Sequence, residues 1–244
     1  MKRNFQQIRI VAPVLPDADF HRQGEVRTMA FIVRQLTNYP LKLTFCVIAL
    51  AVKILGAPSA VHAQTGQLND DDFSASIREW TTRPEFLSPL IIDLPIVDNI
   101  PSPKQIIGHH IGKPGRLTYY EDLLRYYRAL AESSPRVSIV SIGQTDEHRE
   151  MVVVAIANVD TLSKLEEYRG HLRQLADPRR LSETSAKKLI KTAKPIYHFM
   201  AGLHSAETGP AEMLMELAYR LAVEEGPLFD QIRDNVIVTL TPVA

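Results

Sequence analysis

The sequence predicts an α/β sandwich with a mixed sheet, because apolar segments of strand length alternate with segments of helical periodicity. Residues 137–142 and 151–157 are two such apolar segments, and the charged turn 146–149 between them is typical of a hairpin. A third apolar segment, residues 196–200, runs directly into a strongly amphipathic helix. We therefore expect one sheet that contains the two hairpin strands and further strands, with helices in the connections between them.

Residues 29–63 have the pattern of a secretory signal peptide, with cations before a short apolar core and a small-x-Ala cleavage pattern that ends at Ala63. The core contains Lys53 and is shorter than the roughly 20 residues that a transmembrane helix needs. We therefore expect export to the periplasm or the extracellular space without a stable membrane anchor. An extended leader or an uncleaved anchor is the alternative. Residues 1–28 are interpreted as a non-native upstream extension.

Residues 64–101 are rich in Asp, Pro and polar side chains without a sustained period, which predicts a loosely structured lead-in. The folded domain is expected over residues 102–244. Its first helix is expected to start at Thr118, because Thr118 and Glu121 have the spacing of a capping box, and to end before Pro135. The buried stripe of this helix is expected to comprise Tyr120, Leu123, Leu124, Tyr127 and Leu130.

Two polar helices, residues 162–174 and 182–193, are expected between the hairpin and the strand 196–200. The amphipathic helix that follows Glu207 is expected to bury Leu214, Leu217, Ala218 and Leu221. The apolar segment 236–241 is expected to be a central strand of the sheet.

His204 and Glu207 are the candidate metal ligands. They lie three residues apart where a strand gives way to a helix, so both side chains can face one ion. Catalytic zinc takes neutral imidazole and carboxylate ligands. No other His in the sequence has a Glu three residues later. The sequence therefore indicates a Zn²⁺ site, although the spacing also fits an ion pair at a helix start or a hydrogen-bonded loop His.

The other histidines of the domain are expected to be structural or solvated. His198 precedes His204 by six residues on one strand, which at about 3.3 Å per residue is up to roughly 20 Å, so we expect a core His. The same expectation holds for residues in loops, in the charged turn and on a polar helix, namely His109, His110, His148 and His171.

Composition excludes several functions. Lys plus Arg equals Asp plus Glu at 28 each, which removes any overall electrostatic argument for nucleic acid. The single cysteine, Cys46, lies in the leader, so a mature chain has no disulfide. Neither a glycine-rich phosphate loop nor a G-x-S-x-G motif occurs, which disfavours nucleotide binding and serine hydrolysis.

From about residue 100 onward the chain contains, in this order, the motifs His109-His110-Ile111-Gly112, Thr118-Tyr119-Tyr120, Ser134-Pro135-Arg136-Val137, residues 142–150 and Gly202-Leu203-His204-Ser205-Ala206-Glu207. This ordered set resembles the zinc carboxypeptidase family, the carboxypeptidase A-like metallopeptidases. The resemblance implies a three-layer sandwich and Zn²⁺ held by His204 and Glu207 as two of three ligands. It also implies hydrolysis of a C-terminal peptide bond in a peptide or protein substrate.

The chain departs from the family pattern at three places. Ala206 stands where many members have an Arg that holds substrate, and His148 stands where the family's turn has Gly, at a cost if the turn needs a positive φ. The third zinc ligand and the general-base Glu are expected beyond Ala244, so we expect a C-terminally truncated domain with no catalytic residue of its own. The alternatives are a zinc-dependent deacylase of N-acyl amino acids on the same scaffold, and a non-catalytic secreted binding module.

Overall fold

The structure is a computed structural model that describes residues 66–244. The upstream extension 1–28 and the signal peptide 29–63 lie outside the described residues. None of the helices within residues 66–244 is long and apolar enough to cross a membrane. The helices, in chain order, are α3 (Asp71–Trp80), the 3₁₀ helix η1 (Pro84–Phe86), α4 (Pro103–Ile107), α5 (Tyr120–Ser133), α6 (Val159–Ser163), α7 (Leu165–Ala176), the 3₁₀ helix η2 (Pro178–Arg180), α8 (Glu183–Thr192), α9 (Thr208–Val223) and α10 (Pro227–Asn235).

Four strands form one mixed sheet in the order β1-β2-β4-β3, where β1 is Val137–Gln144, β2 is Glu150–Ile156, β3 is Ile196–Met200 and β4 is Ile237–Thr241. The β1–β2 hairpin and the β2–β4 pair are antiparallel, whereas β3 and β4 are parallel. The parallel connection runs through α9 and α10. This topology confirms the expected α/β fold with a mixed sheet and places β4 at its centre.

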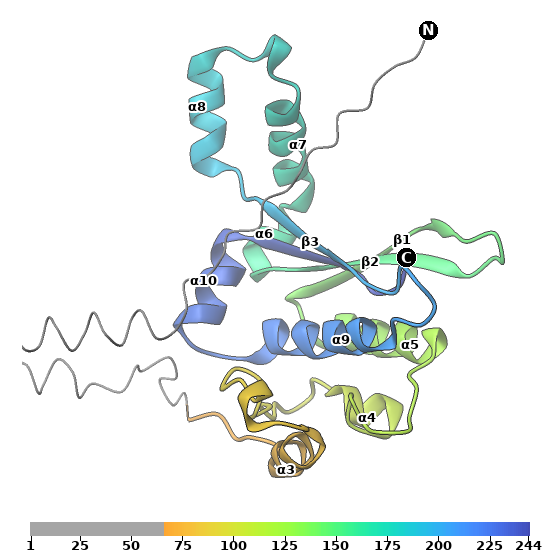
Figure 1. Ribbon diagram of the computed structural model, residues 1–244. Coiled ribbons are helices and arrows are strands. Elements are labelled where there is room, and N and C mark those ends of the chain that lie inside the picture. Colours follow the sequence, from red (N-terminus) through yellow and green to blue (C-terminus); the bar gives the residue numbers. More distant parts are fainter. Residues whose placement is uncertain (1–65) are drawn as a thin grey trace, which may run out of the picture. The chain divides into compact units, whose positions relative to one another are not determined.

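The core lies between the sheet and helices α5 and α9, and α3 and α4 lie on the far side of these two helices from the sheet (Figure 1). Of the stripe expected on α5, Leu123, Tyr127 and Leu130 are buried, whereas Tyr120 and Leu124 are half-buried. Tyr126, which was not expected in the stripe, is fully buried. The buried side chains at this interface include Leu123, Tyr127, Leu130, Val154, Ile156, Leu214, Ala218, Leu221, Val238 and Leu240.

The lead-in 64–101 is more ordered than its composition predicts. Asp70 accepts a hydrogen bond from Phe73 N at 2.9 Å and so caps α3, whose first turn is acidic. The Phe73 and Leu94 side chains are 1% and 2% exposed and belong to the core. The expectation of a loose segment is wrong over α3, because capping and two buried apolar anchors outweigh the polar composition.

Strand β3 is more exposed than its apolar sequence predicts. Among the described residues it pairs only with β4, and the Tyr197 and Met200 side chains are 60% and 58% exposed. His198 is exposed as well, with its Nδ1 2.9 Å from Thr239 Oγ1, so the expectation of a core His is wrong. An apolar strand sequence reports β propensity, and it does not distinguish an edge from an interior strand.

Candidate metal centre

The loop that follows β3 is held against residues 241–244. Ala201 N donates to Thr241 O and Ala244 N donates to Ala201 O, both at 3.0 Å. Gly202 has a φ of +64°, and a Cβ on it would lie 2.9 Å from Val243 Cγ1. Glycine takes both this backbone and this contact without strain. Position 202 therefore fixes the path of the chain into His204.

His204 and Glu207 meet at the start of α9. His204 Nδ1 lies 2.7 Å from Glu207 Oε1, and His204 N donates to Glu207 Oε2 at 3.4 Å. Glu207 is the N-cap residue of α9, and its own N–H donates to His204 O at 3.0 Å. The two side chains are 72% and 47% exposed. The one-turn spacing thus brings the two expected ligands together on an open surface.

The residue types of this pair suit a zinc ion, and binding one would move the two donor atoms further apart. Bonds of about 2.1 Å at a tetrahedral angle place an imidazole nitrogen and a carboxylate oxygen about 3.4 Å apart around zinc. The 2.7 Å contact between His204 Nδ1 and Glu207 Oε1 needs a proton on Nδ1, and a bound ion would replace that proton. The exposure of both side chains leaves positions open for water and substrate, as catalytic zinc requires.

Glu212, one turn further along α9, was missed by the sequence analysis. Its Oε2 accepts from Gly112 N at 2.6 Å and its Oε1 accepts from the Thr118 hydroxyl at 2.7 Å. The expected capping box of Thr118 with Glu121 is therefore wrong, and α5 starts at Tyr120 without a side-chain cap. Glu212 ties the first half of α9, and with it Glu207, to the loop before α5.

A group of three metal-ligating side chains, Asp70, Asp72 and His110, occurs elsewhere in residues 66–244. His110 Nε2 lies 2.8 Å from Asp72 Oδ2, and the Lys104 ammonium donates to the same oxygen. Hydrogen bonds from Lys104 and then His110 lower the pKa of the Asp72 carboxyl. Because an ammonium already neutralises this carboxylate, we assign the group as an ion-pair cluster that joins α3 to the segment after α4. His110 is therefore structural, as expected.

The sequence model of the zinc carboxypeptidase family matches residues 123–244, which is half of the chain and includes His204 and Glu207. The chain belongs to the zinc carboxypeptidase family. The match leaves α3 and α4 outside it, although both contribute to the same core. It also leaves the Asp70, Asp72 and His110 cluster outside, whereas the His204 and Glu207 pair lies inside.

One solved structure similar to this family member is the carboxypeptidase A from Helicoverpa armigera. It is 17% identical, with a TM-score of 0.37, over 58% of this chain and 30% of that chain. This chain therefore spans about 30% of the length of that carboxypeptidase. Comparison with curated proteins gave no match. Membership of the zinc carboxypeptidase family rests on the match of the family's sequence model to residues 123–244.

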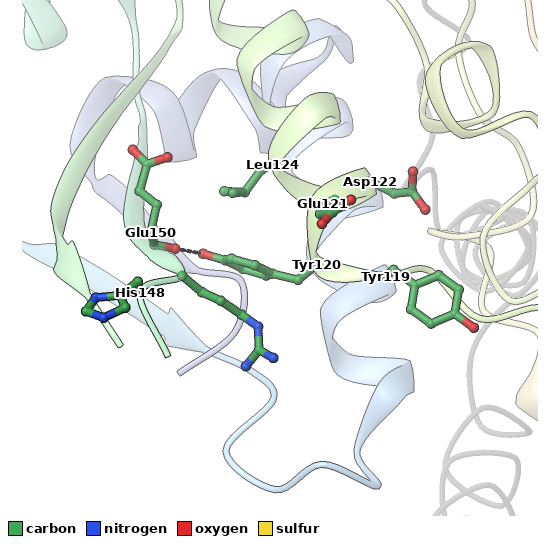
Figure 2. Close-up of a pocket in the computed structure, with 8 residues that line it drawn as sticks. Tyr119, Tyr120, Glu121, Asp122, Leu124, His148 and Glu150 are labelled. Atoms are coloured by element: carbon green, nitrogen blue, oxygen red, sulfur yellow. Dashed lines mark hydrogen bonds between the residues drawn. The ribbon is translucent and has the colours of Figure 1, made fainter. Parts of the chain in front are cut away.

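A pocket of about 600 Å³ lies between the start of α5 and the β1–β2 turn (Figure 2). The Tyr120 hydroxyl donates to the backbone oxygen of Glu150 across it, and burial raises the pKa of Tyr120. His148 lines this pocket with a φ of +62°, so the turn does hold a non-glycine residue in the left-handed region. Neither His204 nor Glu207 lines the pocket. The candidate metal centre of this family member is thus an open surface site.

We expect Gly202→Ala to lower the free energy of unfolding by about 1–2 kcal/mol, because the new Cβ would meet Val243 and would sit at a positive φ. Urea denaturation would measure the loss. Gly209→Ala is the matched control, since nothing lies within 4 Å of a Cβ there and its φ is not positive, so it should change stability little. Adding Val243→Ala should recover the part of the loss that comes from the contact. Equal effects of the two Ala substitutions would contradict the close approach at position 202.

Proposed function

We propose that this chain carries part of the active site of a zinc-dependent carboxypeptidase, with His204 and Glu207 as two of the zinc ligands. The observation that supports the proposal is the 2.7 Å contact between His204 Nδ1 and Glu207 Oε1, inside the segment 123–244 that matches the family. When bound, zinc supplies the Lewis acidity for hydrolysis of a peptide bond. The proposed substrate is the C-terminus of a peptide or protein, and the proposed location is outside the cytoplasm, reached through the signal peptide 29–63.

The residues at the site have two proposed roles, as metal ligands and as residues that position those ligands. His204 would bind through a neutral Nδ1 and Glu207 through its carboxylate, while Gly202 and Glu212 position the two ligands. Catalytic zinc has three protein ligands in most sites. Within residues 66–244 no further His, Cys, Asp or Glu joins the pair as a third ligand. The proposal therefore requires a third ligand from outside the described residues, where the family resemblance also places the general base.

Competition titration of the chain with a zinc-binding dye tests the metal site. Structural sites with four ligands bind zinc with about 10–16 kcal/mol, so two ligands should give a dissociation constant of roughly 1 µM to 0.2 mM. One zinc per chain in this range would support the proposal. Zinc binding no stronger than that of a chain with both ligands replaced by Ala would favour the hydrogen-bonded loop and a non-catalytic binding module.

Substrate assays on a zinc-loaded protein extended to the full length of the family domain separate the two enzymatic alternatives. A dipeptide with a blocked amino terminus reports carboxypeptidase activity, and an N-acetyl amino acid reports deacylation. Release of the C-terminal residue from the dipeptide, faster than release of acetate, would support the peptidase. The opposite order of rates would favour the deacylase.

A further inference from the structure

Helices α7 and α8 form a hairpin that projects away from the sheet and its core (Figure 1). Neither helix contains a buried side chain. The hairpin is tied to the domain at its base, where the Lys194 ammonium donates to Thr161 Oγ1 at 2.5 Å and lies 5.5 Å from the centre of the Tyr168 ring. We call residues 164–194 the helical arm. An element that buries so little contributes little to the core, and most of its side chains face solvent.

The helical arm concentrates positive charge in a chain that is neutral overall. It contains nine of the 28 Lys and Arg residues but four of the 28 Asp and Glu residues, which gives it a net charge of +5. The rest of the chain therefore carries a net charge of −5. The overall balance that argued against a polyanionic partner hides this separation of charge.

Three of the four acidic side chains of the arm are paired with a neighbouring Lys or Arg, and the fourth, Glu167, lies 3.8 Å from His171. Each one faces a basic side chain two to four residues away, in the pairs Glu166 with Arg169, Glu167 with His171, Asp177 with Arg179 and Glu183 with Lys187. Five further cations have no side-chain partner among residues 66–244, and all of them are exposed. They are Lys164, Arg173, Arg180, Lys188 and Lys191. These five are available for an external anion.

The placement of these cations does not help the arm to fold. Lys188 and Lys191 are three residues apart on α8, so their like charges share one helix face and repel by a few tenths of a kcal/mol. Beside them Ile190 is 65% exposed. An apolar side chain among ammonium groups suits a lipid headgroup region, where cations meet phosphates and the apolar group inserts.

We propose that the helical arm binds a membrane surface that carries anionic phospholipid headgroups. Single-stranded nucleic acid fits the arm less well, because Tyr168 is its one Phe, Tyr or Trp residue and is half-buried, so no exposed ring is available for base stacking. The arm leads into the start of β3, whereas His204 follows the end of β3, so the two sites lie at opposite ends of one strand. Binding through the arm therefore leaves the metal pair open, and this proposal is independent of the zinc assignment.

Co-sedimentation of the 244-residue protein with lipid vesicles tests this. The vesicles are phosphatidylcholine with or without about 30% phosphatidylglycerol. The variant R173Q/K188Q/K191Q removes three unpartnered cations of the arm, and R78Q/K113Q/R116Q removes three exposed cations elsewhere as the matched control. We expect the arm variant to lose about 10- to 100-fold in the partition coefficient on the anionic vesicles, the control to lose much less, and about 0.5 M NaCl to abolish the difference.

The apolar segment 43–55 is present in all three proteins, so the difference between vesicle types and between variants is the readout. Circular dichroism should show the same helix content in each, because the substituted side chains are exposed. Equal partition of the wild type into neutral and anionic vesicles, or equal losses in the two triple variants, would overturn the proposal. Tighter arm-dependent binding to labelled duplex DNA than to the vesicles would assign the arm to nucleic acid instead.

Discussion

Replacing His204 with Ala is expected to lower the zinc affinity of the chain at least about 100-fold. Four ligands share about 10–16 kcal/mol in structural zinc sites, so each ligand contributes about 3 kcal/mol. The remaining ligand, Glu207, is a half-exposed carboxylate that would hold zinc no better than many surface acids. Glu207→Gln should have a similar effect, because the amide keeps the shape of the side chain and lacks the anionic oxygen. Competition titration with a chelating dye measures both losses.

The Asp70, Asp72 and His110 cluster provides the control for this experiment. Asp72→Asn removes its central carboxylate, whose side chain is 66% exposed, without opening the core. If the zinc site is at His204, Asp72→Asn should leave the titration unchanged. The double variant His204→Ala/Glu207→Gln should then lose all zinc binding. Loss of zinc with Asp72→Asn and not with His204→Ala would move the metal site to the other cluster.

Sequence reasoning located the elements and the pair because both depend on short stretches of chain. The hairpin follows from two apolar segments around a charged turn, and β3 has the bounds expected for it. His204 and Glu207 lie within one turn of each other, so a strand-to-helix junction is enough to bring their side chains together.

The features that sequence reasoning missed depend on contacts between distant residues. Thr118 has the spacing of a capping residue, yet its hydroxyl donates to Glu212, 94 positions away. Asp72 and His110 are 38 positions apart and have no local pattern that connects them. The exposure of β3 likewise depends on which strands neighbour it in space. A local signal competes with tertiary partners, and at Thr118 the tertiary partner is the stronger one.

Arg233 in α10 makes a tertiary contact of this kind with α9, the helix that begins after Glu207. Its side chain is 3% exposed, and Nη1 donates to Leu221 O at 3.1 Å and to Glu224 O at 2.7 Å, close to the C-terminal end of α9. Nη2 donates to Asp230 Oδ1 at 2.5 Å. The last carbonyls of a helix have no partner within it, and the guanidinium supplies hydrogen-bond donors to the carbonyls of Leu221 and Glu224 at this end of α9.

Arg233→Ala is therefore expected to lower the free energy of unfolding by about 3 kcal/mol, since it removes a buried side chain together with its hydrogen bonds to the carbonyls of Leu221 and Glu224. Urea denaturation followed by circular dichroism measures the change. Asp230→Asn should cost less than about 1 kcal/mol, because the Asp230 side chain is 59% exposed and its ion pair is screened by water. Arg78→Ala, at an exposed arginine of α3, controls for the loss of charge alone. If Arg233→Ala lowers the free energy of unfolding no more than Arg78→Ala does, the guanidinium does not stabilise the end of α9 in solution. The stability of α9 would then come from Glu212 and the apolar core.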